Sequence, residues 1–198
     1  MTMCGRFYIE PEGDLREMLR EANRKQLAVT GQESVAGGEI FPCGVIAALA
    51  HGRNGNSAVY PMRWGYTLNG KPRPVINARS ETAAERPMFR DSWQTRRCLI
   101  PADRYFEWER DAGKKKQKYG ISVKKPGPIF LAGLYRYEPA EPLPACVILT
   151  AEPAEEIRFI HDRMPVIFSG DEAAMWLTED PAGMLFRRET DMVFEPAG

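Results

Sequence analysis

Val45-Ile46-Ala47-Ala48-Leu49 is an apolar run with the length of one β-strand, and Arg53-Asn54-Gly55-Asn56 follows it closely. An Asn-Gly pair between apolar segments is the strongest short-range signal for a tight hairpin turn. The next segment, 58–64, has the composition of a returning strand. These three pieces together predict a β-hairpin, and therefore an antiparallel sheet.

Further short strands are expected after this hairpin, and a helix before it. The strands cover 98–100, 105–108, 119–123, 129–134, 145–150 and 166–168. The helix carries apolar residues at helical spacing, namely Leu15, Met18, Leu19 and Ala22. Short helices are expected at 153–159 and 171–177. Because most strands follow one another through short turns, we expect one α+β domain over residues 1–198, with a curved, largely antiparallel, barrel-like sheet and a few peripheral helices.

Composition narrows the class of protein. A hydrophobic content of 43% and a charged content of 27% are typical of a soluble globular protein. The sequence contains no apolar run long enough to span a bilayer and no signal-peptide core, so we expect a cytoplasmic protein without a membrane partner. Its four cysteines are far apart and it has two histidines. We therefore expect no metal and no cofactor.

The net charge of zero conceals a division along the chain. Residues 86–125 are rich in Lys and Arg, whereas 171–198 are mainly acidic. Aromatic residues are interleaved with the basic ones, namely Phe89, Trp93, Tyr105, Phe106, Trp108 and Tyr119. Such a mixture suits a surface that contacts phosphates and stacks on bases.

Cys4 follows an in-frame methionine, Met3. If the residues ahead of Cys4 are removed, its α-amine and thiol form a 1,2-aminothiol. An aldehyde condenses with the amine to an imine, and the sulfur then closes a stable thiazolidine ring. The α-amine titrates near pH 8, so part of it is neutral and nucleophilic at physiological pH. The alternative is that Cys4 stays internal, behind Met1-Thr2, as a small apolar residue.

Four polar positions stand out from the predicted scaffold: Arg6, Asn77, Glu107 and His161. Glu107 lies among aromatic residues, where desolvation raises a carboxyl pKa and suits the group to proton transfer. Each has a structural alternative. Asn77 is also typical of a turn, Glu107 of an ion pair with Arg104 or Arg110, and His161 of a helix C-cap.

In their order along the chain, these positions resemble the SOS-response-associated peptidase family. The motifs are Cys4-Gly5-Arg6-Phe7, Arg63-Trp64-Gly65, Asn77-Ala78-Arg79-Ser80-Glu81-Thr82, Arg97-Cys98-Leu99-Ile100-Pro101-Ala102-Asp103, Phe106-Glu107-Trp108 and His161-Asp162-Arg163-Met164-Pro165. The resemblance covers about residues 4–177. It implies a protein that senses abasic sites in single-stranded DNA and crosslinks to them in the DNA-damage response, as a monomer that associates with the nucleoid when bound.

The resemblance also implies roles for individual residues. Cys4 captures the C1′ aldehyde, Asn77 holds the cysteine or the sugar, and Glu107 moves protons during imine formation and sugar opening. His161 assists ring opening and reversal of the crosslink. The implied DNA contacts are phosphate contacts by three arginines and a stacked or wedged indole, namely Arg6, Arg79, Arg163 and Trp64. A peptidase activity that releases the residues ahead of Cys4 is implied as well.

The chain departs from the family pattern at three places. Met1-Thr2 precede the usual Met-Cys start, and 65–70 lack the usual Pro and Trp. Glu39 replaces the asparagine of an Asn-x-x-Pro element, which predicts a weaker grip on DNA. Two rival functions stay open: a glutamine amidotransferase with an N-terminal cysteine nucleophile, and a DNA-binding module without chemistry.

Overall fold

The computed structural model describes residues 4–52, 55–68, 72–110, 116–139 and 141–197. Its strands are β1 (Phe7–Ile9), β2 (Gly38–Ile40), β3 (Val45–His51), β4 (Ser57–Trp64), β5 (Asn77–Arg79), β6 (Arg97–Ala102), β7 (Arg104–Trp108), β8 (Lys118–Val123), β9 (Ile129–Arg136), β10 (Ala145–Ala151), β11 (Met164–Pro165), β12 (Ile167–Phe168) and β13 (Met192–Ala197). Its helices are α1 (Gly13–Thr30), α2 (Ser80–Ala83), α3 (Arg90–Thr95), α4 (Gly170–Thr178) and α5 (Pro181–Met184), with 3-10 turns η1 (Glu155–Ile157) and η2 (Leu185–Arg187). The predicted α+β class is confirmed.

Five strands close into a ring. β10 pairs with β4, β4 with β3, β3 with β6, β6 with β9, and β9 with β10 again. Within the ring only the β10–β4 pairing is parallel; β5 adds a second parallel partner at the edge of β10. Every residue of β10 is buried, and its two faces belong to two different hydrophobic clusters. The predicted curved, barrel-like, largely antiparallel sheet is therefore confirmed.

A second, antiparallel sheet has the strand order β13-β8-β7-β1-β2. Side chains alternate between its faces. Phe7 and Ile9 of β1 and Tyr105 of β7 are buried, whereas Tyr8 and Arg104, paired across the same two strands, are less buried. The sheet therefore has an inward face that joins the core and an outward face that bears polar side chains.

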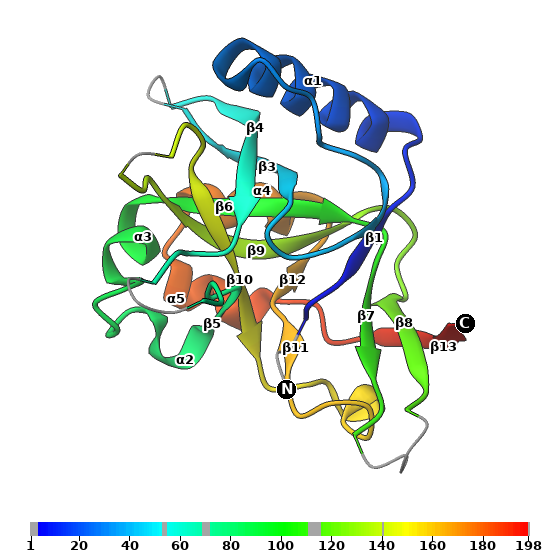
Figure 1. The fold of residues 1–198 in the computed structure, drawn as a ribbon. Helices are drawn as coiled ribbons and strands as arrows, with labels where there is room; N and C mark the ends of the chain where they lie inside the picture. Colours follow the sequence, from blue (N-terminus) through cyan, green and yellow to red (C-terminus); the bar gives the residue numbers. More distant parts are fainter. Residues whose placement is uncertain (1–3, 53–54, 69–71, 111–115, 140, 198) are drawn as a thin grey trace.

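The helices lie around the strands (Figure 1). α1 runs beside β3 and β4, and its predicted apolar stripe is buried at Leu15, Leu19 and Ala22. α4 packs on β6, where the indole N–H of Trp176 donates to Cys98 O at 3.0 Å. None of the helices in the described ranges is long and apolar enough to cross a membrane.

The predicted hairpin is present, with Val45 opposite Arg63 and His51 opposite Ser57. Its Arg53-Asn54 corner lies outside the described residues. The helix expected at 153–159 is wrong, because only the 3-10 turn η1 forms there. The strand expected at 166–168 begins one residue later, as β12. Sequence analysis missed the three-residue strands β1, β2 and β5 and the two-residue β11, which are too short to show periodicity. It also missed the six-residue β13, which is mostly exposed and contains Pro196.

Candidate active site

Cys4 and Glu107 meet at the start of β1. The backbone N–H of Cys4 donates to Glu107 Oε1 at 2.5 Å, although the two residues are 103 positions apart. Glu107 projects from the inward face of β7, opposite Tyr119 of β8. Cys4 is 1% exposed and Glu107 is 6% exposed. The carboxylate is therefore held against the nitrogen that becomes the α-amine if Cys4 is made N-terminal.

Burial sets the protonation of both groups. Desolvation raises the pKa of Glu107 to about 7; hydrogen bonds from Cys4 and Trp108 oppose this shift, and the charge of Asp162 adds to it. Desolvation also raises the pKa of the Cys4 thiol well above its usual value, and the charge of Glu107 raises it further. At neutral pH the site thus holds a neutral thiol beside a carboxyl group that can both donate and accept a proton.

The structural alternative for Glu107, an ion pair with Arg104 or Arg110, is wrong. Arg104 Nη1 pairs with Glu195 at 2.5 Å, and Arg110 Nη1 pairs with Asp162 at 2.9 Å. Both neighbouring arginines are thus engaged with other carboxylates. The pKa of Glu107 rises chiefly because burial desolvates its carboxyl group.

His161 reaches the same region from the segment between η1 and β11. The residue is 7% exposed, Nδ1 lies 2.9 Å from Asp162 Oδ1, and the backbone N–H of Arg163 donates to Nδ1 with an N–N distance of 3.2 Å. Desolvation lowers the pKa of His161, and the charge of Asp162 opposes that shift. Because Asp162 also raises the pKa of Glu107, it acts on both titratable groups. Sequence analysis missed Asp162, which only adjacency to His161 could have indicated.

Asn77 opens β5, which pairs with β10 at Ile148. Both polar atoms of its side-chain amide are buried without a hydrogen-bond partner among the described residues. An unpaired buried amide is costly, and such groups gather where a ligand completes the bonding. The turn alternative does not describe Asn77, because the residue lies in a strand.

Trp64 contacts both β1, which follows Cys4, and the residue that precedes Asn77. Its ring lies 5.2 Å from that of Phe7, and its indole N–H donates to Ile76 O at 3.1 Å. Contacts of Trp64 thus link the start of β1 with the residue that precedes Asn77. Trp64 is 0% exposed, so the stacking or wedging expected of its indole has no support, and Trp64 is a core residue.

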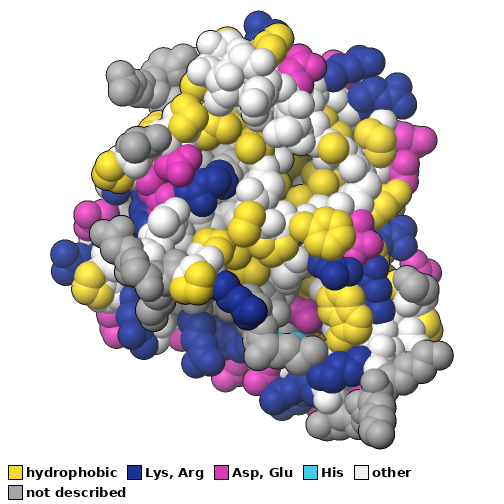
Figure 2. Space-filling model, in the orientation of Figure 1, with side chains coloured by type: hydrophobic (Ala, Val, Ile, Leu, Met, Phe, Trp, Pro, Cys, Tyr) yellow, Lys and Arg dark blue, Asp and Glu magenta, His cyan; other side chains and the backbone are white. Residues whose placement is uncertain are grey.

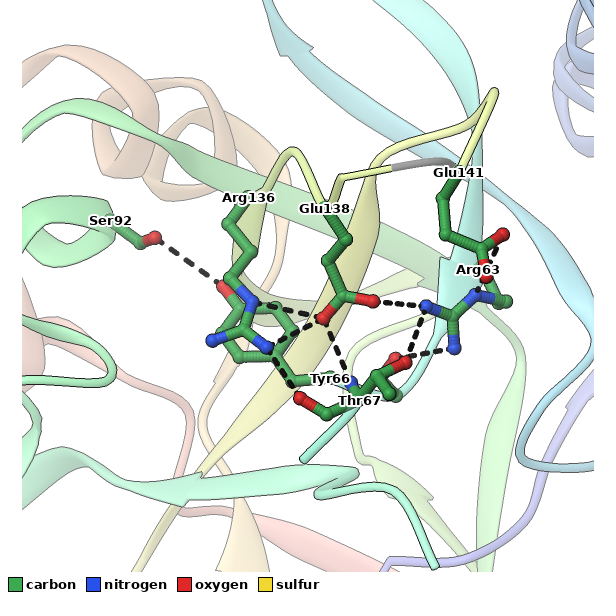
Figure 3. A network of polar contacts seen from close by, with 8 residues as sticks. Arg63, Tyr66, Thr67, Ser92, Arg136, Glu138 and Glu141 are labelled. Atoms are coloured by element: carbon green, nitrogen blue, oxygen red, sulfur yellow. Dashed lines mark hydrogen bonds and ion pairs between the residues drawn. The ribbon is translucent and has the colours of Figure 1, made fainter. Parts of the chain in front are cut away.

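Close packing at Gly65 and hydrogen bonds to Glu138 fix the conformation of the segment after Trp64. Gly65 has φ of 131°, and a Cβ there would lie 2.8 Å from Pro74 Cβ, so only glycine fits. Figure 3 shows the polar network beyond it: Glu138 accepts from Arg63, from Arg136 at 2.6 Å and from the N–H of Thr67 at 2.8 Å. This network explains the arginine of the Arg63-Trp64-Gly65 motif. Part of the segment 65–70, which lacks the Pro and Trp usual in the family, lies outside the described residues.

The three arginines expected to contact phosphates differ in how exposed they are and in whether a carboxylate already pairs with them. Arg79 is exposed, and no carboxylate in the described ranges pairs with it. Arg163 is 11% exposed and donates to both oxygens of Glu81, at 2.5 and 2.6 Å. The Arg6 side chain is 37% exposed and pairs with Glu39 at 3.0 Å. Among these three arginines, Arg79 alone is exposed and without a carboxylate partner in the part of the chain that the structure describes.

The aromatic residues of the basic stretch do not form one surface. Tyr105, Trp93 and Phe106 are buried. Phe106 and Trp108 contact cations on the outward face of the second sheet. Figure 2 shows Lys and Arg side chains over several parts of the face viewed in Figure 1, with hydrophobic and acidic side chains among them. No group of three His, Cys, Asp or Glu side chains able to hold a metal ion occurs in the described part of the chain.

Comparison with known proteins assigns the family. A model of the SOS response associated peptidase (SRAP) family matches residues 3–192. The abasic site processing protein YoqW of Bacillus subtilis is 33% identical over 183 residues, covering 88% of this chain and 80% of that protein. YedK of Escherichia coli, also an abasic site processing protein, is 33% identical over 186 residues, covering 91% and 82%. A crystal structure of a Bacteroides thetaiotaomicron protein superposes with a TM-score of 0.75, at 20% identity, covering 98% of this chain and 92% of that one. The chain belongs to the SOS response associated peptidase family.

Proposed function

We propose that this protein recognises abasic sites in single-stranded DNA and crosslinks to them through Cys4. The observation that carries this proposal is the 2.5 Å contact between the Cys4 nitrogen and the Glu107 carboxylate in a buried site. The relatives YoqW and YedK, which are named abasic site processing proteins, support the substrate class. Membership of this family removes the support for the amidotransferase alternative.

The first step frees the α-amine of Cys4. Hydrolysis of the peptide bond between Met3 and Cys4 adds the water hydroxyl to the carbonyl carbon and a proton to the nitrogen. Glu107 lies against that nitrogen, so it can supply the proton to the departing amine. The same contact then lets Glu107 accept a proton from the α-ammonium, whose ordinary pKa is about 8.

The second step joins protein and DNA. The ring-opened abasic sugar offers a C1′ aldehyde, and the Cys4 amine adds to it to give a carbinolamine. A proton from Glu107 lets the hydroxyl leave as water, which forms the imine. The sulfur then adds to the imine carbon as its proton moves to the nitrogen, and the thiazolidine is complete. Burial raises the pKa of Glu107 in the uncleaved chain to about 7. Desolvation of this kind is what suits a carboxyl group to proton transfer at neutral pH.

The other two residues act on the sugar. The unpartnered amide of Asn77 can donate to and accept from sugar hydroxyls, which would satisfy its buried polar atoms. His161, whose pKa is lowered chiefly by burial, is a neutral imidazole able to accept a proton during ring opening. Arg79, exposed beside Asn77 on β5, contributes a phosphate contact.

The test is crosslinking by protein that begins at Cys4. We expect a heat-stable adduct with single-stranded DNA that carries an abasic site and none with intact DNA, because only the former offers an aldehyde. Cys4→Ser should leave at most a labile imine, since an oxazolidine is much less stable than a thiazolidine. Denaturing gels after heating provide the measurement. An equal yield from Cys4→Ala would contradict the proposal.

A further inference from the structure

One carboxylate on the outward face of the second sheet holds two cations. Glu39, on the edge strand β2, pairs with Arg6 Nη1 at 3.0 Å and with Lys118 Nζ at 3.0 Å. Arg6 precedes β1 and Lys118 opens β8, so the three side chains come from three parts of the sequence. Sequence analysis singled out Arg6 and Glu39 but not Lys118, because Lys118 lies 79 positions from Glu39 and on a strand that is not adjacent to β2 in the sheet.

Aromatic rings surround these cations. The Arg6 guanidinium lies 4.6 Å from the Phe41 ring centroid and 4.9 Å from that of Trp108. The Lys118 ammonium lies 3.9 Å from the centroid of the Phe106 ring. Phe41 is 49% exposed, so one ring is open to solvent beside the positive charges. Cations along a groove together with an exposed aromatic ring are the features that bind single-stranded nucleic acid.

Glu39 stays ionised in this setting. Burial alone would raise its pKa, but hydrogen bonds from Lys118 and Arg6 outweigh that effect and leave the pKa lowered. A carboxylate and a phosphate diester accept the same hydrogen bonds from the same donors, and they repel each other. A phosphate that approaches Arg6 and Lys118 must therefore compete with Glu39.

We infer that Arg6 and Lys118 form a phosphate subsite for single-stranded DNA, which Glu39 occupies in the free protein and must vacate when the strand binds. The inference rests on the proposed function and deepens it. Lys118 becomes a DNA contact, and Glu39 becomes the residue that limits affinity. The exposed face of Phe41 would stack on the adjacent base, which only an unpaired strand can present.

The test is the affinity of the full chain for an undamaged oligothymidylate, measured by fluorescence anisotropy over a series of salt concentrations. Glu39→Gln should tighten binding by about tenfold, since two ion pairs no longer compete with phosphate. Its affinity should also fall more steeply with salt, by about 0.7 in the logarithmic slope for each additional phosphate neutralised on a single strand. The matched control is Glu17→Gln, which removes the same charge from the exposed Glu17–Arg20 pair on α1 and should change neither quantity.

A second variant tests the role of Lys118. In the Glu39→Gln background, Lys118→Gln should lower affinity by about tenfold, but in the wild-type background by only about threefold, because there Glu39 already engages the ammonium. Unchanged or weaker binding by Glu39→Gln would overturn the inference, as would an equal effect of Lys118→Gln in both backgrounds. The oligonucleotide has no aldehyde, so these outcomes are independent of whether Cys4 forms a crosslink.

Discussion

Replacing Glu107 with glutamine should stabilise the fold at alkaline pH while slowing the reaction. The carboxyl group is 6% exposed, and its pKa is raised from 4.5 to about 7, chiefly by desolvation. Glutamine has nearly the same shape and retains a carbonyl oxygen that can accept from Cys4. It cannot ionise, so the variant removes the cost of a buried charge and the proton-transfer group together.

The size of the stability effect follows from linkage. Below pH 4.5 the carboxyl group is neutral in both the folded and the unfolded states, so it contributes no difference. Between pH 4.5 and about 7 the unfolded state ionises first, and the wild-type free energy of unfolding falls. Above that range the loss levels off at about 3 kcal/mol, at 1.4 kcal/mol for each pH unit between the two pKa values.

The measurement is urea unfolding of wild type and Glu107→Gln at about pH 4.5 and 8. We expect the difference between the two proteins to grow by about 3 kcal/mol in favour of the variant as the pH rises. Any altered hydrogen bond to Cys4 adds an offset that is the same at both pH values and does not affect this reading. Glu109→Gln, two residues farther along the chain, is the control. A difference that does not change with pH would refute the desolvation argument.

The same variant should slow the chemistry. Single-turnover crosslinking to abasic DNA by Glu107→Gln should be about 10²-fold slower than by wild type, the usual loss for one general acid or base. Binding to undamaged DNA should be unaffected, because Glu107 lies on the inward face of its strand. A variant with the wild-type rate and pH profile would leave Glu107 without a catalytic role.

Two further predictions concern the surroundings of Asn77. Arg79→Glu should slow crosslinking to dilute abasic DNA by about tenfold without changing the reaction with a small free aldehyde, because the side chain is exposed and would meet phosphate; equal slowing of both reactions would contradict this role. Gly65→Ala should lower the free energy of unfolding by about 3 kcal/mol, since the new methyl group would clash with Pro74 and φ is 131°. Urea unfolding checks this, and a loss below about 1 kcal/mol would show that the segment relaxes.

Local sequence patterns sufficed for most of the longer elements of the fold, but not for the six-residue strand β13. The apolar run from Val45 and the returning segment to Trp64 specified their hairpin, because alternation and turn chemistry act between neighbouring residues. The apolar residues at helical spacing also predicted α1 correctly. The three-residue strands β1, β2 and β5 were not, since so few residues form strands only where a partner strand already lies beside them.

The chemistry was foreseeable as residue types but not as contacts. An early cysteine, a carboxylate among aromatic residues and a histidine indicated the proposed reaction, and the order of the motifs indicated the family. Their partners depended on the folded chain. Glu107 accepts a hydrogen bond from the Cys4 nitrogen, 103 positions away in the sequence, and Glu39 accepts one from Lys118, 79 positions away. Which charges meet is set by strand order and sheet curvature, and these arise from packing the whole chain rather than from any local pattern. The same packing placed Trp64 in the core. There its ring cannot contact DNA, and its contacts with Phe7 and Ile76 hold the strands that carry the candidate site.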